Sequence, residues 1–191
     1  MTKLVLASAS PRRLELLKST KIFPDIVEPA NIDESIKKKE KPKFYLKRIC
    51  FEKASIIQQK YKEDIILSAD TIVSTNHKIF GKPQNKEEAI EILRYLSGRN
   101  HNVSTGVCVL YKDKKTIKII DTKIKFKKLH SDEIKQYIKT NEWVDKAGSY
   151  GIQGFAERFI ININGSYSNV VGLPLYELSL IHISEPTRPQ C

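Results

Sequence analysis

The chain has 191 residues, of which 40% are hydrophobic and 29% are charged. This length and composition suit one globular domain with a core and exclude collagen-like and wholly disordered chains. The apolar runs are far shorter than the roughly 20 residues of a membrane span, and no signal-peptide core is present, so we expect a cytoplasmic protein without a membrane partner. The formal net charge of +11 predicts an anionic partner, and charge alone does not choose between small phosphates, nucleic acid and a membrane surface.

The first elements read from the sequence are a strand, a helix and a second strand. Residues 3–7 predict a short buried strand, and Ser10 and Pro11 predict the N-cap and the first position of a helix. A short strand is then expected over 25–27. The polar residues 29–43 that follow it predict a surface loop.

The next elements are predicted from apolar spacing. A helix is expected over 42–60, with Lys53 close to its inner stripe, and a strand over 64–68. A hairpin over 71–80 is expected to follow directly. Asp70 is therefore predicted to lie at a strand end.

The second half of the chain mixes helices with long strands. Asn85 predicts the cap of a helix that Gly98 ends. The other predicted elements are strands over 101–111, 116–126 and 158–163 and helices from 131 and 172. Together they predict an α/β or α+β domain with a mixed sheet.

The end of the chain differs in character from the rest. Residues 180–191 include two prolines and have no amphipathic period. We interpret them as a non-native tail of the kind left by a cloning or sequencing adapter. A single domain is then expected over 1–179.

The cysteines and histidines form no recognisable site. Cys50, Cys108 and Cys191 are widely spaced, which predicts neither a disulfide framework nor a thiolate metal site, and the first two are expected in the core. The four histidines lack metal-ligand spacing. The Walker pattern GxxxxGK[ST] and the dinucleotide pattern GxGxxG are both missing from the sequence.

The stretch Ser8-Ala9-Ser10-Pro11-Arg12-Arg13 carries the most chemical information. A turn from a strand into a helix offers backbone N–H groups, two hydroxyls and two guanidiniums, which suit a phosphate. An ordinary N-cap with two exposed arginines is the alternative. Two cations at the positive end of a helix are unfavourable by themselves, which favours a bound anion.

Carboxylates give a second candidate site. Asp70 follows an apolar strand that would hold it rigidly, and Asp33 and Glu34 lie together in the polar loop. Such groups could bind a hard cation such as Mg²⁺, or Asp70 could act as a general base on a water. A turn-forming aspartate is the alternative for Asp70.

Three further polar side chains are candidates for ligand contacts. Lys82 lies in a constrained Gly-Lys-Pro turn, and Lys53 lies on its helix; solvated lysines are the alternative for both. Gln153 stands between two glycines, where its amide could read a nucleobase edge. A structural turn is the alternative there.

Several of these residues belong to short blocks that follow one another along residues 4–178. The blocks are Leu6-Ala7-Ser8-Ala9-Ser10-Pro11-Arg12-Arg13, Glu52-Lys53-Ala54, Ala69-Asp70-Thr71, Gly81-Lys82-Pro83, Leu96-Ser97-Gly98, Thr105-Gly106-Val107, Asp145-Lys146-Ala147-Gly148-Ser149-Tyr150-Gly151-Ile152-Gln153-Gly154 and Asn169-Val170-Val171-Gly172-Leu173-Pro174. In this order they closely resemble the Maf family of nucleoside triphosphate pyrophosphatases.

The resemblance implies a fold and a reaction. The fold is an elongated mixed sheet with flanking helices and a central cleft, of the inosine-triphosphatase-like kind, often in a homodimer. The reaction is hydrolysis of a nucleoside triphosphate between its α- and β-phosphates, with Mg²⁺ or Mn²⁺, giving a monophosphate and pyrophosphate. The block at 145–154 resembles the branch that acts on dTTP and UTP, with modified pyrimidine nucleotides as further candidate substrates, and not the 7-methyl-GTP branch.

The resemblance also implies roles for single residues. Asp70 matches the general base, and Asp70 with Glu34 matches the metal-side carboxylates, with Asp33 as the alternative to Glu34 because the loop varies in length. The positions matching specificity residues are Arg12, Thr71 and Gln153, and those matching phosphate contacts are Ser8, Arg13, Lys53 and Lys82.

A hypothesis from a different class is a basic protein that binds nucleic acid or regulates cell division, a role also linked to Maf-like proteins as septum-formation inhibitors. The charge of +11 permits it. However, the lysine runs alternate with apolar or acidic residues, and no pair of aromatics offers a stacking platform. Nucleic acid is therefore the less favoured partner.

Overall fold

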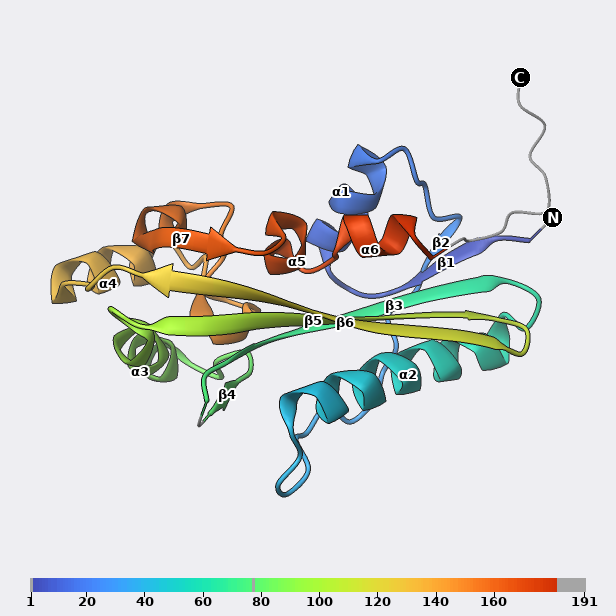
Figure 1. Ribbon diagram of the computed structural model, residues 1–191, viewed down its shortest axis with the longest axis horizontal. Helices are drawn as coiled ribbons and strands as arrows, with labels where there is room; N and C mark the ends of the chain where they lie inside the picture. The colour runs from blue at the N-terminus through green and yellow to red at the C-terminus, as the bar shows by residue number, and fades with distance from the viewer. Residues whose placement is uncertain (1, 77, 182–191) are drawn as a thin grey trace. The chain divides into compact units, whose positions relative to one another are not determined.

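The computed structural model describes residues 2–76 and 78–181 (Figure 1). Its centre is a seven-stranded sheet in the order β2-β1-β3-β5-β6-β7, with β4 paired to β3. β1 is parallel to β2 and β3, whereas β4 is antiparallel to β3 and β7 to β6, which confirms the predicted mixed sheet. The strands are β1 (Leu4–Ala7), β2 (Ile26–Val27), β3 (Ile65–Ser74), β4 (Ile79–Phe80), β5 (Asn100–Tyr111), β6 (Lys114–Phe126) and β7 (Ile160–Asn164).

The chain divides into two compact units. Of the described residues, unit 1 contains 2–70, 106–119 and 172–181, and unit 2 contains 71–105 and 120–171. The long strands β3, β5 and β6 contribute residues to both. The single domain over 1–179 and the central cleft stay predictions, and residues 182–191 of the predicted tail lie outside the described residues.

Unit 1 packs helices on both faces of its strands. The helices are α1 (Pro11–Ser19), α2 (Pro42–Lys60) and α6 (Leu175–Ser179). On one face Leu17 and Leu178 pack with Leu6 and Leu67, and on the other Cys50 and Ala54 of α2 pack with Val5 and Ile66. Figure 1 shows α2 on the opposite side of the strands from α1 and α6. Burial of these apolar side chains holds the unit together.

The two cysteines of unit 1 behave as predicted. Cys50 and Cys108 are free and buried. Burial raises the pKa of Cys50, and it raises that of Cys108 to about 12. Both thiols therefore act as small core side chains rather than as thiolates.

Unit 2 is built around an aromatic core. Its helices are α3 (Lys86–Leu96), α4 (Ser131–Lys139), α5 (Tyr167–Val171) and two short 3-10 turns, Ala147–Ser149 and Phe155–Phe159. Phe126, Tyr137 and Phe159 are buried at its centre, with edge-to-face contacts among them. As predicted, the Asn85 side chain caps α3 by accepting from the Glu88 N–H at 2.8 Å, and Gly98 adopts a φ of +70° after the helix. No helix among the described residues is long and apolar enough to cross a membrane.

The predicted position of Asp70 at a strand end is wrong. β3 continues from Ile65 to Ser74, so Asp70 lies inside it, and the end of the strand pairs with β4 through Val73 and Phe80. The prediction placed a strand over 64–68 and the first strand of a hairpin over 71–74, whereas the two are one continuous strand. The carboxylate is tolerated inside the strand because it has a cationic partner, which is described below.

Gly106 is held in a place that has no room for a side chain. A Cβ built on it would lie 2.7 Å from Cys50 Sγ, 3.0 Å from Ile119 Cδ1 and 3.2 Å from Leu46 Cβ. We expect Gly106→Ala to lower the free energy of unfolding by about 1–3 kcal/mol through overpacking. Denaturant unfolding followed by circular dichroism measures this.

Gly81→Ala is the control, because nothing lies within 4 Å of its Cβ position. Adding Cys50→Ala to the Gly106 variant removes the nearest atom, so the two substitutions should be less destabilising together than the sum of each alone. Full additivity, or an undisturbed Gly106→Ala variant, would contradict the steric account.

His101 makes the stability of unit 2 sensitive to acid. Its Nε2 lies 2.8 Å from the Tyr150 hydroxyl, and burial lowers the pKa of the imidazole to about 4. In the unfolded chain the His101 imidazole binds a proton near pH 6.5. The free energy of unfolding therefore has its full value above that pH and falls by at most about 3 kcal/mol as the pH drops toward 4. We expect His101→Gln to flatten this part of the pH profile of unfolding.

Candidate functional site

A buried ammonium lies at the centre of the candidate site in unit 1. The apolar stripe of α2 faces the strands, and Lys53 lies close enough to that stripe to be only 8% exposed. Its Nζ lies 2.7 Å from Asp70 Oδ1 and 2.8 Å from Glu34 Oε1. The structure thus brings together three of the predicted site residues, from a helix, a strand and a loop.

The charge on Lys53 is stabilised by these two carboxylates. Burial lowers the pKa of the ammonium, but the attraction of Asp70 and the hydrogen bonds from Lys53 to Asp70 and Glu34 outweigh it, so the pKa is raised. Lys53 is therefore cationic at neutral pH. A buried ammonium without such partners is strongly unfavourable, so the three groups depend on one another.

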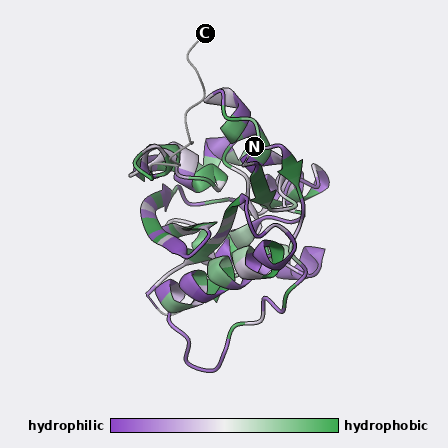
Figure 2. Ribbon diagram, turned by 90° about the vertical axis from the view of Figure 1, so that its right-hand side faces the viewer, coloured by the Kyte–Doolittle hydropathy of each residue, from purple (hydrophilic) through white to green (hydrophobic). Residues whose placement is uncertain are grey.

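The loop that carries Glu34 is tied to α2 by Arg48. The guanidinium donates to both oxygens of Glu40, at 2.8 and 2.7 Å, and to the Ser35 carbonyl at 3.0 Å, while the Tyr45 hydroxyl donates to the Glu34 carbonyl at 3.0 Å. The hydrogen bonds from Arg48 to Glu40 lower the pKa of Glu40 to about 2. Figure 2 shows this loop, the lowest part of the view, as largely hydrophilic. The loop is therefore held by polar bonds to α2 rather than by packing in an apolar core.

The structure distinguishes the two neighbouring acids of this loop. Asp33 accepts from the N–H and the hydroxyl of Ser35, both at 2.9 Å, which closes a local turn and lowers the pKa of Asp33. Glu34, and not Asp33, reaches Lys53. Of the two carboxylates that the sequence left open, Glu34 is the one placed with Asp70.

The turn from β1 into α1 holds a second group of predicted residues. Ser8 is buried, and its hydroxyl accepts from Arg13 Nη1 at 3.0 Å. Arg13 Nε donates to the carbonyl of Gly172 at 2.8 Å, so the guanidinium is fixed from two sides. Ser10 is the N-cap as predicted, although its side chain makes no capping bond, and Arg12 is half-buried on the first turn.

Thr71 belongs to a hydrogen-bonded chain within unit 2. It follows Asp70 on β3, so its side chain leaves the strand on the opposite side. Its hydroxyl lies 2.9 Å from that of Thr105, which donates to the Asn169 carbonyl at 2.9 Å. Asn169 in turn donates to the Val103 carbonyl and to the Thr122 hydroxyl. Thr71 is thereby held on a rigid, buried polar network.

Lys82 and Gln153 are exposed side chains on loops of unit 2. The loop with Lys82 follows β4 and is joined to the block over 145–154, because the Gly81 carbonyl accepts from the Gly148 N–H at 3.0 Å. Gly148 has a φ of +69°, and a Cβ there would lie 2.6 Å from Val73. The glycine therefore allows the two loops to approach each other closely.

The chain matches the Maf-like protein family over residues 3–181. It belongs to this family. A "dTTP/UTP pyrophosphatase" of Rhizobium johnstonii is 47% identical over 190 residues, covering 96% of this chain and 92% of that protein. A "dTTP/UTP pyrophosphatase" of Pyrococcus furiosus is 46% identical over 175 residues, covering 92% of this chain and 91% of that protein. Among solved structures, the Staphylococcus aureus Ham1 protein aligns with a TM-score of 0.45 and 14% identity, covering 64% of this chain and 71% of that one.

The donor groups of this Maf-family chain fit a divalent metal that is shared with a substrate. Glu34 and Asp70 each place an oxygen within 3 Å of the Lys53 nitrogen, so two carboxylates lie beside each other around that ammonium. Mg²⁺ is commonly held by one or two carboxylates together with substrate phosphates and water. No group of three or more histidine, cysteine, aspartate or glutamate side chains that could hold a metal ion occurs among the described residues.

The residues that position this site carry no recognisable signal in the sequence. Arg48 and Glu40 are eight residues apart in a lysine-rich region, and no spacing rule marks them as a pair. Thr105 and Asn169 do lie within the family-like blocks, but nothing in their type indicates that they bond to each other and support Thr71. Long-range side-chain bonds of this kind are visible only in the folded chain.

The bonds from Arg48 predict how the loop responds to mutation. Arg48→Gln removes the charge-assisted bonds to Glu40, whose carboxylate also accepts from the Lys37 N–H at 3.0 Å. We expect the amide hydrogens of residues 35–40 to exchange at least about ten-fold faster. Hydrogen exchange with mass spectrometry measures this, and Lys47→Gln, an exposed neighbour, should change nothing. Equal exchange in both variants would contradict the role of Arg48.

Proposed function

We propose that this Maf-family chain is a nucleoside triphosphate pyrophosphatase that hydrolyses dTTP and UTP to the monophosphate and pyrophosphate, with modified pyrimidine nucleotides as further substrates. The observation that carries the proposal is the agreement between sequence and site. Relatives named dTTP/UTP pyrophosphatase are 46–47% identical over nearly the whole chain, and the Lys53–Asp70–Glu34 cluster lies at positions expected for catalysis.

The chemistry requires one activated water and stabilisation of negative charge. In the proposed reaction, the Asp70 carboxylate accepts a proton from water as the water oxygen bonds to the α-phosphorus. The bond from that phosphorus to the oxygen bridging the α- and β-phosphates breaks, and pyrophosphate leaves. Lys53 orients the carboxylate through its contact with Oδ1. General-base catalysis of this kind contributes about 10²- to 10⁴-fold to the rate.

Binding and specificity are assigned to the remaining residues. Ser8, Arg13, Lys53 and Lys82 would contact the phosphates. Arg13 is suited to this because Ser8 and Gly172 already fix its guanidinium. Arg12, Thr71 and Gln153 would select the pyrimidine nucleotide.

A divalent metal, Mg²⁺ or Mn²⁺, is part of the proposal. Glu34 and Asp70 would hold it, and when bound it would neutralise charge on the phosphate oxygens. Glu34 is supplied by the loop that Arg48 ties to α2, so that loop would support metal binding without contacting the metal.

We also propose a cytoplasmic homodimer, on the basis of the family resemblance. Light scattering of the purified chain measures its mass directly. A monomer at micromolar concentration would remove the dimer from the proposal and leave the catalytic assignment in place.

The reaction predicts a clear effect of Asp70→Asn. This substitution removes the base while keeping the size of the side chain, so we expect pyrophosphate release from dTTP and UTP to fall by at least about 10²-fold. The assay compares dTTP, UTP, CTP, dATP, GTP and 7-methyl-GTP with Mg²⁺ or Mn²⁺.

Asp113→Asn, in the exposed turn between β5 and β6, is the matched control and should keep full activity. Circular dichroism and thermal unfolding establish that each variant is folded. Full activity of a folded Asp70→Asn variant would overturn the base assignment. Failure of the unaltered chain to release pyrophosphate from any nucleotide would overturn the proposed function.

A further inference from the structure

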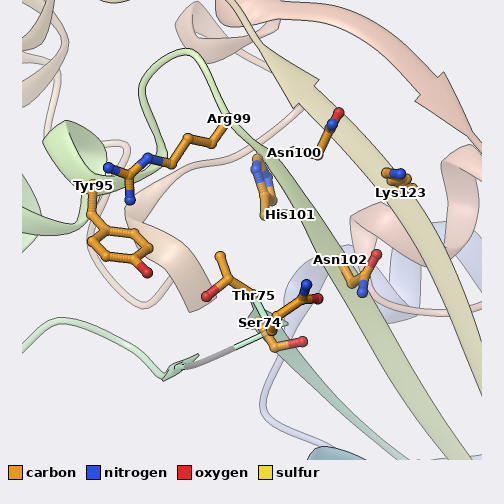
Figure 3. A pocket seen from close by; sticks show the side chains of 9 residues that line it. Ser74, Thr75, Tyr95, Arg99, Asn100, His101, Asn102 and Lys123 are labelled. Atoms are coloured by element: carbon orange, nitrogen blue, oxygen red, sulfur yellow. The ribbon is translucent and has the colours of Figure 1, made fainter.

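Unit 2 contains a pocket that includes none of the residues proposed for hydrolysis. Its volume is about 390 Å³, within the range of small-molecule sites. It lies where the end of β3, the segment after α3, the start of β5 and one residue of β6 meet (Figure 3). Its lining consists of Ser74, Thr75, Asn76, Tyr95, Arg99, Asn100, His101, Asn102 and Lys123.

The lining is cationic and rich in hydrogen-bonding groups. Arg99 and Lys123 bring two positive charges, and none of the nine residues is an aspartate or glutamate. Within the described part of the chain, no ion pair joins either cation to a carboxylate. Two cations that share a pocket without a counter-charge repel each other, and a bound anion would relieve that repulsion.

The Arg99 side chain lies over an aromatic ring of the same unit. Its guanidinium carbon lies 4.5 Å from the centre of the Tyr95 ring, which in turn packs 5.1 Å from the ring of Phe80. A planar guanidinium stacked on an aromatic ring loses little freedom when it binds an anion, and its fork of N–H groups matches two oxygens of a phosphate. Figure 3 shows the Arg99 and Tyr95 side chains lying together at one side of the pocket.

The pocket wall also contains a polar atom without a partner. The Thr75 hydroxyl oxygen is buried and has no hydrogen-bond partner among the described residues. A buried hydroxyl in this state costs free energy that a polar ligand or water would recover. His101 completes the wall and is itself fixed by the 2.8 Å contact with the Tyr150 hydroxyl. The wall is thus rigid at His101 and has an unused hydrogen-bonding group at Thr75.

From these observations we infer that the pocket is a second ligand site, which binds a phosphate-bearing anion of about the size of a nucleoside monophosphate. The phosphate is bound by Arg99, and Lys123 adds a second positive charge at the other side of the pocket (Figure 3). The remaining volume is lined by the hydroxyls of Ser74 and Thr75 and by asparagine amides, which offer donors and acceptors to a sugar or base. Inorganic phosphate alone would leave most of the 390 Å³ without ligand contacts.

The test is binding of UMP, uridine and inorganic phosphate to the full chain, measured by isothermal titration calorimetry at constant ionic strength. We expect UMP to bind more tightly than inorganic phosphate and uridine at least ten-fold more weakly than UMP. Equal affinities of UMP and uridine would overturn phosphate recognition. Equal affinities of UMP and inorganic phosphate would overturn the inference that the ligand has the size of a nucleotide. No binding of UMP at millimolar concentration would overturn the proposed site.

The location of the UMP site is tested with charge-matched variants. Arg99→Gln and Lys123→Gln should each weaken UMP binding by at least about ten-fold. Arg94→Gln and Lys125→Gln remove the same charges from exposed residues of α3 and β6 outside the pocket and should leave binding unchanged. Loss of binding in all four variants would indicate a general charge effect, and loss in none would place the ligand elsewhere; either result overturns the proposal.

Hydrogen exchange separates this site from the proposed hydrolytic one. UMP should protect amides of residues 74–76 and 99–102, and the Arg99→Gln variant should lose that protection. The same variant should keep its rate of pyrophosphate release from saturating UTP, because Arg99 is not among the residues proposed for hydrolysis. Protection only around residues 8–13 would overturn the second site without affecting the proposed function.

Discussion

The structure of unit 1 depends on one buried charge. The Lys53 ammonium is 8% exposed and is tolerable only with counter-charges nearby, so a loop, a strand and a helix must all be correctly placed. α2 must turn Lys53 inward, β3 must present Asp70 opposite it, and the loop must bring Glu34. Removing Lys53 would leave two carboxylates facing each other without their cation, and removing Asp70 would leave the buried ammonium with only the exposed Glu34 as a partner. The candidate site is therefore also a structural requirement of this unit.

This requirement explains why an otherwise basic chain concentrates polar bonds around a short loop. The loop over 28–41 has little apolar surface to bury, and Arg48 holds it through Glu40 and the Ser35 carbonyl. The chain as a whole has a formal net charge of +11, which favours anionic partners. Glu34 and Asp70 instead place two negative charges beside Lys53, at one point of this basic chain.

Most elements could be predicted from the sequence because their signals are local. The apolar stripe of α2 and the Asn85 cap of α3 depend only on neighbouring residues, and both are confirmed. The failures concern interactions between distant residues. Asp70 was expected to end a strand because the bond to Lys53, seventeen residues away, is not visible in a local window. For the same reason, the Arg48–Glu40 pair and the hydrogen-bonded chain from Thr71 through Thr105 to Asn169 could not be predicted.

The corrected position of Asp70 has a mechanical consequence. Inside a continuous strand, successive side chains point to opposite faces, so the pleat of β3 fixes the directions of Asp70 and Thr71 together. Asp70 meets Lys53, whereas Thr71 meets the Thr105–Asn169 chain. At a strand end, either side chain could rotate with its turn. Within β3, a shift of one residue in register would exchange the two faces and bury a carboxylate against hydroxyls, so the pairing of β3 with β1 and β4 specifies where the carboxylate points.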